Sequence, residues 1–148
     1  MSITLVIQDE RWRKLRGLSP QVKRAVKTAL AEAGAPEDSD LTVMLTTNGR
    51  VQKLNAAFRG KDKPTNVLSF PAGLDDYLGD VALAYGVTAR EAKEGKKTLL
   101  DHTTHLVVHG VLHLLGYDHE TSRQAGKMEP LEVRILKILK IANPYEVV

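Results

Sequence analysis

Three histidines constrain this chain more than any other feature of its sequence. His109 and His113 are four residues apart, and His119 follows after a glycine at position 116. Residues four apart lie on one face of an α-helix, and a glycine just past the helix lets the chain reverse. We therefore expect the three imidazoles to meet around one point. Three imidazoles leave a tetrahedral ion one open position, so the spacing predicts a catalytic metal site, with Zn²⁺ as the default ion.

The same spacing is that of the metzincin zinc peptidases, which predicts a metzincin-like metal helix. In those enzymes a glutamate follows the first histidine and acts as the general base, whereas this chain has Gly110 there. A peptidase of that type is therefore disfavoured. Water would have to be activated mainly by the metal, or by a base from elsewhere in the chain. Asp118 could be such a base or a fourth ligand, or it could shape the turn or orient a ligand histidine.

Two further histidines precede the proposed ligands on the same helical stripe. His105 lies about one turn before His109, and His102 lies about one turn before His105. Such residues can hold the ligands in place, carry protons or simply line the mouth of the helix. The spacing alone does not choose among these roles.

A second polar segment begins at Arg59 and continues through Lys61 and Lys63. Arg59 stands at the predicted end of a helix, where a cation complements the helix dipole. It could instead clamp a phosphate and stabilise the charge of a transition state, with the two lysines binding the substrate. Residues 1–74 carry 12 Lys and Arg against 7 acidic residues, whereas residues 75–148 carry 9 against 11. This distribution is consistent with a basic cleft for phosphates or with a surface tuned for solubility.

The composition is that of an ordinary globular protein with an aliphatic core. With 148 residues, of which 43% are hydrophobic and 26% charged, the chain is expected to form a single domain over residues 1–148. The absence of cysteine excludes disulfides and thiolate metal sites, and an aromatic content of only 5% argues against a stacking platform for bases. Residues 1–9 do not read as a secretion signal, and no apolar stretch approaches a membrane span. We therefore expect a cytoplasmic protein.

The pattern of apolar and capping residues predicts a small mixed sheet flanked by helices. Strands are expected at 3–7, 41–45, 67–70 and 80–84, and helices at about 20–33, 48–59, 88–94, 99–115 and 120–142. The predicted N-caps are Ser19, Thr47 or Asn48, Thr88 and Thr98, and Pro130 should kink or restart the last helix. Phe58 and Ile138 are predicted to be buried. Strands gathered early and long helices late favour the α+β class.

Both polar segments, in this order, resemble the YbeY family of bacterial endoribonucleases. The motifs that carry the resemblance are Phe58-Arg59, Pro64-Thr65-Asn66-Val67-Leu68-Ser69-Phe70-Pro71, Gly79-Asp80 and the segment from His105 to His119. The resemblance implies a zinc-dependent, single-strand-specific endoribonuclease that matures the 3′ end of small-subunit ribosomal RNA and takes part in ribosome quality control. It assigns the metal to His109, His113 and His119, and a catalytic or substrate-binding role to Arg59. The implied partners are single-stranded ribosomal RNA and the ribosomal particle, with ribosomal or assembly proteins as further candidates.

Two other functions remain open at this point. The chain could be a metal hydrolase of a small substrate, or a ribosome-assembly factor whose metal mainly stabilises the fold. Cleavage of single-stranded RNA that requires both the metal and Arg59 would favour the nuclease. Unchanged binding to pre-ribosomal particles after replacement of His113 would favour the assembly factor.

Overall fold

The computed structural model describes residues 2–36, 38–74 and 76–145. Its helices and strands, in chain order, are β1 (Ile3–Ile7), α1 (Glu10–Arg13), α2 (Leu18–Glu32), β2 (Asp40–Thr46), α3 (Asn48–Arg59), β3 (Val67–Pro71), β4 (Tyr77–Ala84), α4 (Tyr85–Glu94), α5 (Leu99–Leu114) and α6 (Ser122–Ile138). The strands all precede α4, α5 and α6, and the α+β class predicted from that order is confirmed.

The strands form one mixed sheet in the order β1-β2-β4-β3. The pairs β1–β2 and β2–β4 are parallel, whereas β3 is antiparallel to β4 and lies at an edge. Val43 pairs with Val81, and Leu45 pairs with Leu83. Side chains two residues apart share one face of a strand, so these four residues form a continuous buried strip across the middle of the sheet.

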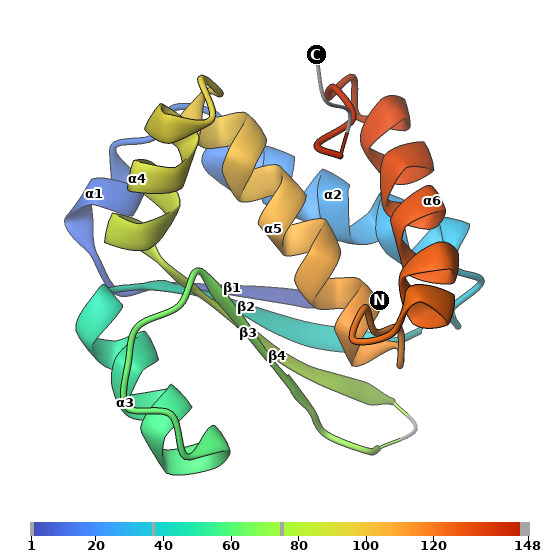
Figure 1. The fold of residues 1–148 in the computed structure, drawn as a ribbon, viewed down its shortest axis with the longest axis horizontal. Helices are drawn as coiled ribbons and strands as arrows, with labels where there is room; N and C mark the ends of the chain where they lie inside the picture. The colour runs from blue at the N-terminus through green and yellow to red at the C-terminus, as the bar shows by residue number, and fades with distance from the viewer. Residues whose placement is uncertain (1, 37, 75, 146–148) are drawn as a thin grey trace.

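Helices cover both faces of the sheet (Figure 1). The buried strip belongs to the main core, which includes residues of α2, α5 and α6. On the other face, Ala82 and Ala84 pack with Val51 of α3 in a smaller core. Helix α5 runs across β3 and β4, which places its C-terminal half beside the edge of the sheet.

The helix caps around the polar segments follow the sequence signals. The Thr47 hydroxyl accepts a hydrogen bond from the backbone N–H of Arg50 at 3.1 Å, and α3 ends at Gly60, which is left-handed with φ of 69°. Thr98 caps α5 in the same way through the N–H of Asp101 at 3.1 Å. Gly116, with φ of 95°, turns the chain back after α5, as its position beyond the helix predicted.

Two predicted helix starts are wrong. Helix α2 begins at Leu18 after a left-handed Gly17, so Ser19 lies inside the first turn rather than at the cap. Pro20 is tolerated there because the first N–H groups of a helix have no partner within the helix. Helix α4 begins at Tyr85, and the Thr88 hydroxyl bonds to the carbonyl of Ala84 instead of capping the helix.

Three other expectations are also corrected. Helix α6 reads through Pro130 and ends at Ile138 rather than near residue 142, so of the two predicted effects of the proline the restart is wrong. The carbonyl that loses its donor belongs to Gly126, which is exposed and can be solvated. Phe58 and Ile138 are exposed: the Phe58 ring meets Phe70 edge-on and stays largely open to solvent, and Ile138 lies at the end of its helix. None of the helices in the described part of the chain is both long and apolar enough to cross a membrane.

Candidate metal centre

The three predicted ligands meet at the C-terminal end of α5. His109 and His113 project from the helix, and His119 returns to them on the loop that follows Gly116. The ring centroids lie 4.6 Å apart for His109 and His113, and 5.1 and 5.2 Å from each of these to His119. One nitrogen from each ring lies within 4.8 Å of the other two, so the group could hold one metal ion.

The environment of these rings suits neutral imidazole. Burial lowers the pKa of His113, and the neighbouring His109 and His119 lower it further. The Nε2 atoms of His109 and His113 are 3.0 Å apart. A metal ion binds the lone pair of a neutral ring nitrogen, so a lowered pKa makes this donor set fit an ion near neutral pH.

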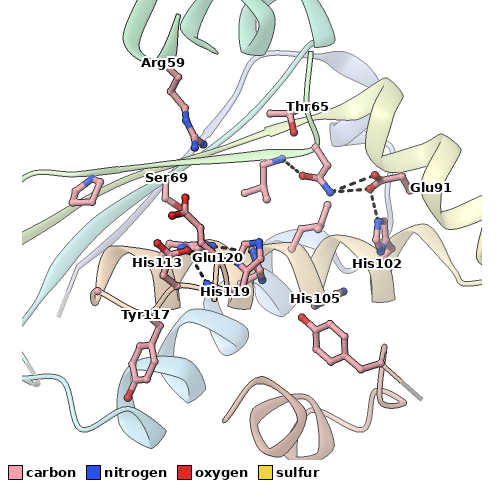
Figure 2. Close-up of a pocket in the computed structure, with 18 residues that line it drawn as sticks. Arg59, Thr65, Ser69, Glu91, His102, His105, His113, Tyr117, His119 and Glu120 are labelled. Atoms are coloured by element: carbon pink, nitrogen blue, oxygen red, sulfur yellow. Dashed lines mark hydrogen bonds and ion pairs between the residues drawn. The ribbon is translucent and has the colours of Figure 1, made fainter. Parts of the chain in front are cut away.

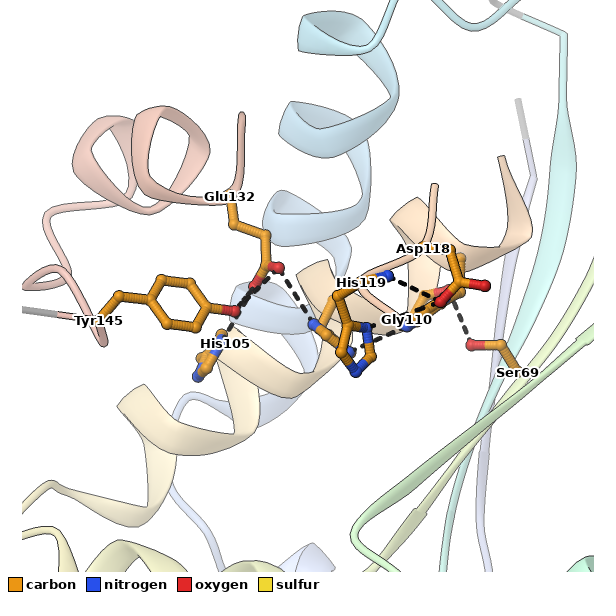
Figure 3. Close-up of polar contacts among 9 residues, drawn as sticks. Ser69, His105, Gly110, Asp118, His119, Glu132 and Tyr145 are labelled. Atoms are coloured by element: carbon orange, nitrogen blue, oxygen red, sulfur yellow. Dashed lines mark hydrogen bonds and ion pairs between the residues drawn. The ribbon is translucent and has the colours of Figure 1, made fainter. Parts of the chain in front are cut away.

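Glu132, which sequence analysis missed, lies directly behind the predicted ligands. It is fully buried in α6, with Oε1 3.1 Å from His109 Nδ1 and Oε2 3.1 Å from His105 Nε2. The Tyr145 hydroxyl donates to both carboxylate oxygens at 3.0 Å (Figure 3). Burial by itself would raise the pKa of Glu132, but the hydrogen bonds from His105 and His109 prevail and lower it to about 2. The sequence did contain a signal for this residue, because Glu132 is a charged residue on the otherwise apolar face of its helix.

The roles left open for His102 and Asp118 are narrowed by their contacts. His102 Nε2 lies 2.9 Å from Glu91 Oε1, which also accepts a hydrogen bond from the Asn66 side chain at 3.0 Å. His102 is thus bound to a carboxylate away from the three-histidine group. Asp118 accepts a hydrogen bond from the backbone N–H of His119 at 2.7 Å, which shapes the turn that carries this ligand.

Gly110 lies where α5 comes closest to the sheet. An added Cβ would meet Val81 Cγ1 at 2.6 Å and Ser69 Oγ at 3.3 Å. The Ser69 hydroxyl also donates to the Gly110 carbonyl at 2.8 Å, which ties β3 to the helix beside the ligands. A side chain at this position would have to displace the buried Val81 side chain, so the packing disfavours the glutamate of the peptidase pattern here.

A cleft of about 760 Å³ passes over the histidines between α5 and the β3 side of the sheet. Arg59 lines it, and Figure 2 shows its guanidinium directed toward Ser69 and the histidine helix. Among the described residues, no carboxylate lies within ion-pair distance of Arg59, which leaves the guanidinium available to a ligand. Lys61 and Lys63 are exposed on the next loop and do not line the cleft. Its walls are therefore less basic than the charge distribution suggested, since they also carry Glu91, Asp118 and Glu120.

Comparison with known proteins identifies the family. A sequence profile described as "Endoribonuclease YbeY" matches residues 6–140. The chain belongs to the YbeY family. Proteins named Endoribonuclease YbeY from Chelativorans sp. (strain BNC1) and Dinoroseobacter shibae are 51% and 43% identical to it, over 88% and 98% of this chain and 83% and 91% of their own lengths. The solution structure of TM1509 from Thermotoga maritima is similar in fold alone, with a TM-score of 0.58 and 24% identity over 98% of this chain and 99% of that one.

The resemblance stated from the sequence is confirmed by this match. As a YbeY endoribonuclease, the chain is a hydrolase that acts on RNA. The family and the geometry agree on a metal-assisted reaction, because the cleft contains a three-histidine group able to hold an ion.

Proposed function

We propose that this chain is a zinc-dependent, single-strand-specific endoribonuclease that acts in maturation of the 3′ end of small-subunit ribosomal RNA and in ribosome quality control. The observation that carries the proposal is the placement of three convergent imidazoles and Arg59 on the walls of one cleft. Residues 1–148 act as one catalytic domain in the cytoplasm. Its partners are single-stranded ribosomal RNA and the ribosomal particle, with ribosomal or assembly proteins that present the RNA.

The site has two functions carried by different residues: the histidines hold an ion, and Arg59 neutralises charge on the phosphate. His109, His113 and His119 hold the ion through ring nitrogens, and Zn²⁺ bound there supplies Lewis-acid chemistry toward the attacked phosphate. Arg59 reaches the same phosphate from the α3 side of the cleft through paired planar N–H donors. It stabilises the negative charge that develops as the phosphorus is attacked.

The size of the cleft supports a single-stranded substrate. A volume of about 760 Å³ lies within the range of pockets for small molecules, which is about 300–1,000 Å³. Such a space is on the scale of a small ligand rather than of a nucleic-acid duplex. Lys61 and Lys63, outside the cleft, bind phosphates of the flanking strand and so contribute affinity without reading the base sequence.

The decisive experiment replaces Arg59 and measures the cleavage of single-stranded RNA under single-turnover conditions. Arg59→Ala should keep the metal and the fold but slow cleavage by about 30- to 1,000-fold, which corresponds to a transition-state clamp worth roughly 2–4 kcal/mol. Arg59→Lys should rescue poorly, because an ammonium cannot make the paired planar contact. Arg50→Ala is the matched control, since Arg50 is an exposed arginine of the same helix that does not line the cleft.

Near-wild-type cleavage by Arg59→Ala would show that Arg59 is not catalytic and only complements the dipole at the end of its helix. Loss of metal from Arg59→Ala would show that the variant disturbs the site and would contradict the separation of roles between the histidines and the arginine. Analysis of the product ends identifies the nucleophile, because a 2′,3′-cyclic phosphate is formed when the RNA's own 2′-hydroxyl attacks.

A further inference from the structure

The buried carboxylate of Glu132 is the strongest polar feature that the proposed reaction leaves without a role. An ionised carboxylate is costly to bury unless hydrogen bonds replace its water. Three donors reach this one: His105 and His109 from α5, and Tyr145 from the segment that follows α6. The side chain is 0% exposed, so neither substrate nor solvent can be its partner. Its contacts instead fix the orientation of the groups around it (Figure 3).

The hydrogen-bond chemistry decides the tautomer of His109. An ionised carboxylate only accepts hydrogen bonds, so the His109 Nδ1 atom, 3.1 Å from Glu132 Oε1, must carry the hydrogen. In the neutral ring the lone pair then lies on Nε2. That atom faces His113 Nε2 at 3.0 Å, on the side of the three-histidine group. The lone pair of His109 is thereby directed to the place where an ion would be held.

We propose that Glu132, itself held by Tyr145, is a positioning residue that sets the tautomer and ring orientation in which His109 binds the metal. The inference rests on the metal site of the proposed function and assigns it two residues from the C-terminal part of the chain. A carboxylate behind a ligand histidine also makes the ring a stronger donor to the ion.

A competing arrangement would make Glu132 a ligand, because His105, His109 and Glu132 also form a group compact enough to hold a metal. The contacts of the carboxylate favour the positioning role. Each oxygen faces a different imidazole at 3.1 Å, and the Tyr145 hydroxyl lies 3.0 Å from both oxygens. These donors occupy the oxygen lone pairs that an ion would need.

Two substitutions separate these possibilities. Glu132→Gln keeps the shape but turns one oxygen into an N–H donor, so one of the two imidazoles must change its tautomer or rotate. We expect about 10- to 100-fold weaker zinc binding, measured by competition with a chromogenic chelator. Tyr145→Phe keeps the carboxylate and removes only one of its donors, so it should weaken zinc binding by a smaller factor. Glu94→Gln, which removes an exposed carboxylate of α4, is the control for charge and should bind zinc like the parent.

A direct measurement on the unmodified protein keeps the inference testable even if Glu132→Gln does not fold. Ring ¹⁵N chemical shifts of the metal-free protein should show His109 with hydrogen on Nδ1. X-ray absorption of the zinc-loaded protein should show the same number of imidazole ligands in the parent and in Tyr145→Phe.

Three results would overturn the positioning role. They are hydrogen on Nε2 of His109 in the metal-free protein, parental zinc affinity in a folded Glu132→Gln, and a first coordination shell that includes the Glu132 carboxylate. A parent protein that binds no zinc at all would instead overturn the metal site of the proposed function, so the two failures are distinguishable.

Discussion

Replacing Gly110 by alanine tests the close contact between α5 and the sheet. The substitution adds one methyl group, whose carbon would lie 2.6 Å from Val81 Cγ1 and 3.3 Å from Val67 Cγ2. Val81 is 0% exposed and β-branched, so it cannot move aside at low cost. Forcing an extra methylene-sized group into a packed core costs about 1–3 kcal/mol. Alanine also favours a helix over glycine by about 1 kcal/mol, so the net expectation is a loss of up to about 2 kcal/mol.

A second glycine provides the matched control. Gly126 lies inside α6, is exposed, and an added Cβ would meet no atom of the described residues within 4 Å. Gly126→Ala should therefore add the higher helix propensity of alanine without any crowding, and it should stabilise the protein by roughly 0.5–1 kcal/mol. The difference between the two variants removes the propensity contribution and isolates the cost of crowding, which we expect to be about 1–3 kcal/mol.

Urea unfolding followed by far-UV circular dichroism gives these free energies of unfolding, with a chelator present so that metal binding does not stabilise the folded state. In a Val81→Ala background the methyl group of Gly110→Ala has room, and the second substitution should become neutral or stabilising. If Gly110→Ala is as stable as Gly126→Ala in the parent background, the contact between helix and sheet is not close, and our account of why a glycine stands beside the first ligand is wrong.

Three further predictions address the site. His113→Ala removes one of three ligands and should abolish stoichiometric metal binding in elemental analysis, whereas a full equivalent of retained metal would contradict the assignment. In the double variant Lys61→Ala/Lys63→Ala, the slope of log affinity for single-stranded oligomers against log salt concentration should become shallower by up to about 0.7 for each lost phosphate contact. An unchanged slope would show that the two lysines do not contact the RNA. Burial lowers the pKa of His102 in the folded protein, although the hydrogen bond to Glu91 opposes the shift. The unfolded chain therefore binds a proton on this histidine at a higher pH than the folded protein does. As a result, the free energy of unfolding should fall as the pH drops below 6.5. His102→Gln should reduce that fall in urea unfolding of the metal-free protein, and an equal fall would assign it to other groups.

The local parts of this architecture were predictable from the sequence. The cap at Thr98, the reversal at Gly116 and the helical spacing of His109 and His113 are short-range features, and each is found where the sequence placed it. Errors arose where packing outweighed a local signal. Ser19 has the chemistry of a cap, but burial of Leu18 against the core draws the start of α2 back to Gly17.

The carboxylate behind the site could not be assigned from spacing, because it is formed across long separations. Glu132 is 23 residues from His109 and 27 residues from His105 along the chain. Only the packing of α6 beside α5 brings them together. A buried position for Glu132 could have been suspected, since Met128, Leu131, Ile135 and Leu136 share its helical stripe. The hydrogen-bond partners of such a glutamate depend on the tertiary fold, and the apolar pattern within one helix does not say which residues of another helix pack against it.

The packing also explains which catalytic strategy this site can use. At the position after His109, a Cβ added to Gly110 would lie 2.6 Å from Val81 Cγ1, so the packing disfavours a glutamate as general base there. Glu132 cannot replace it, because it is fully buried, accepts three hydrogen bonds and has a pKa lowered to about 2, which makes it a weak base near neutral pH. Of the carboxylates along the cleft, Glu120 is the exposed one beside His119, whereas Asp118 is bound to the turn. In the proposed reaction, charge neutralisation would therefore come from the ion held by the three histidines and from the Arg59 guanidinium, which is chemistry suited to attack on a phosphodiester.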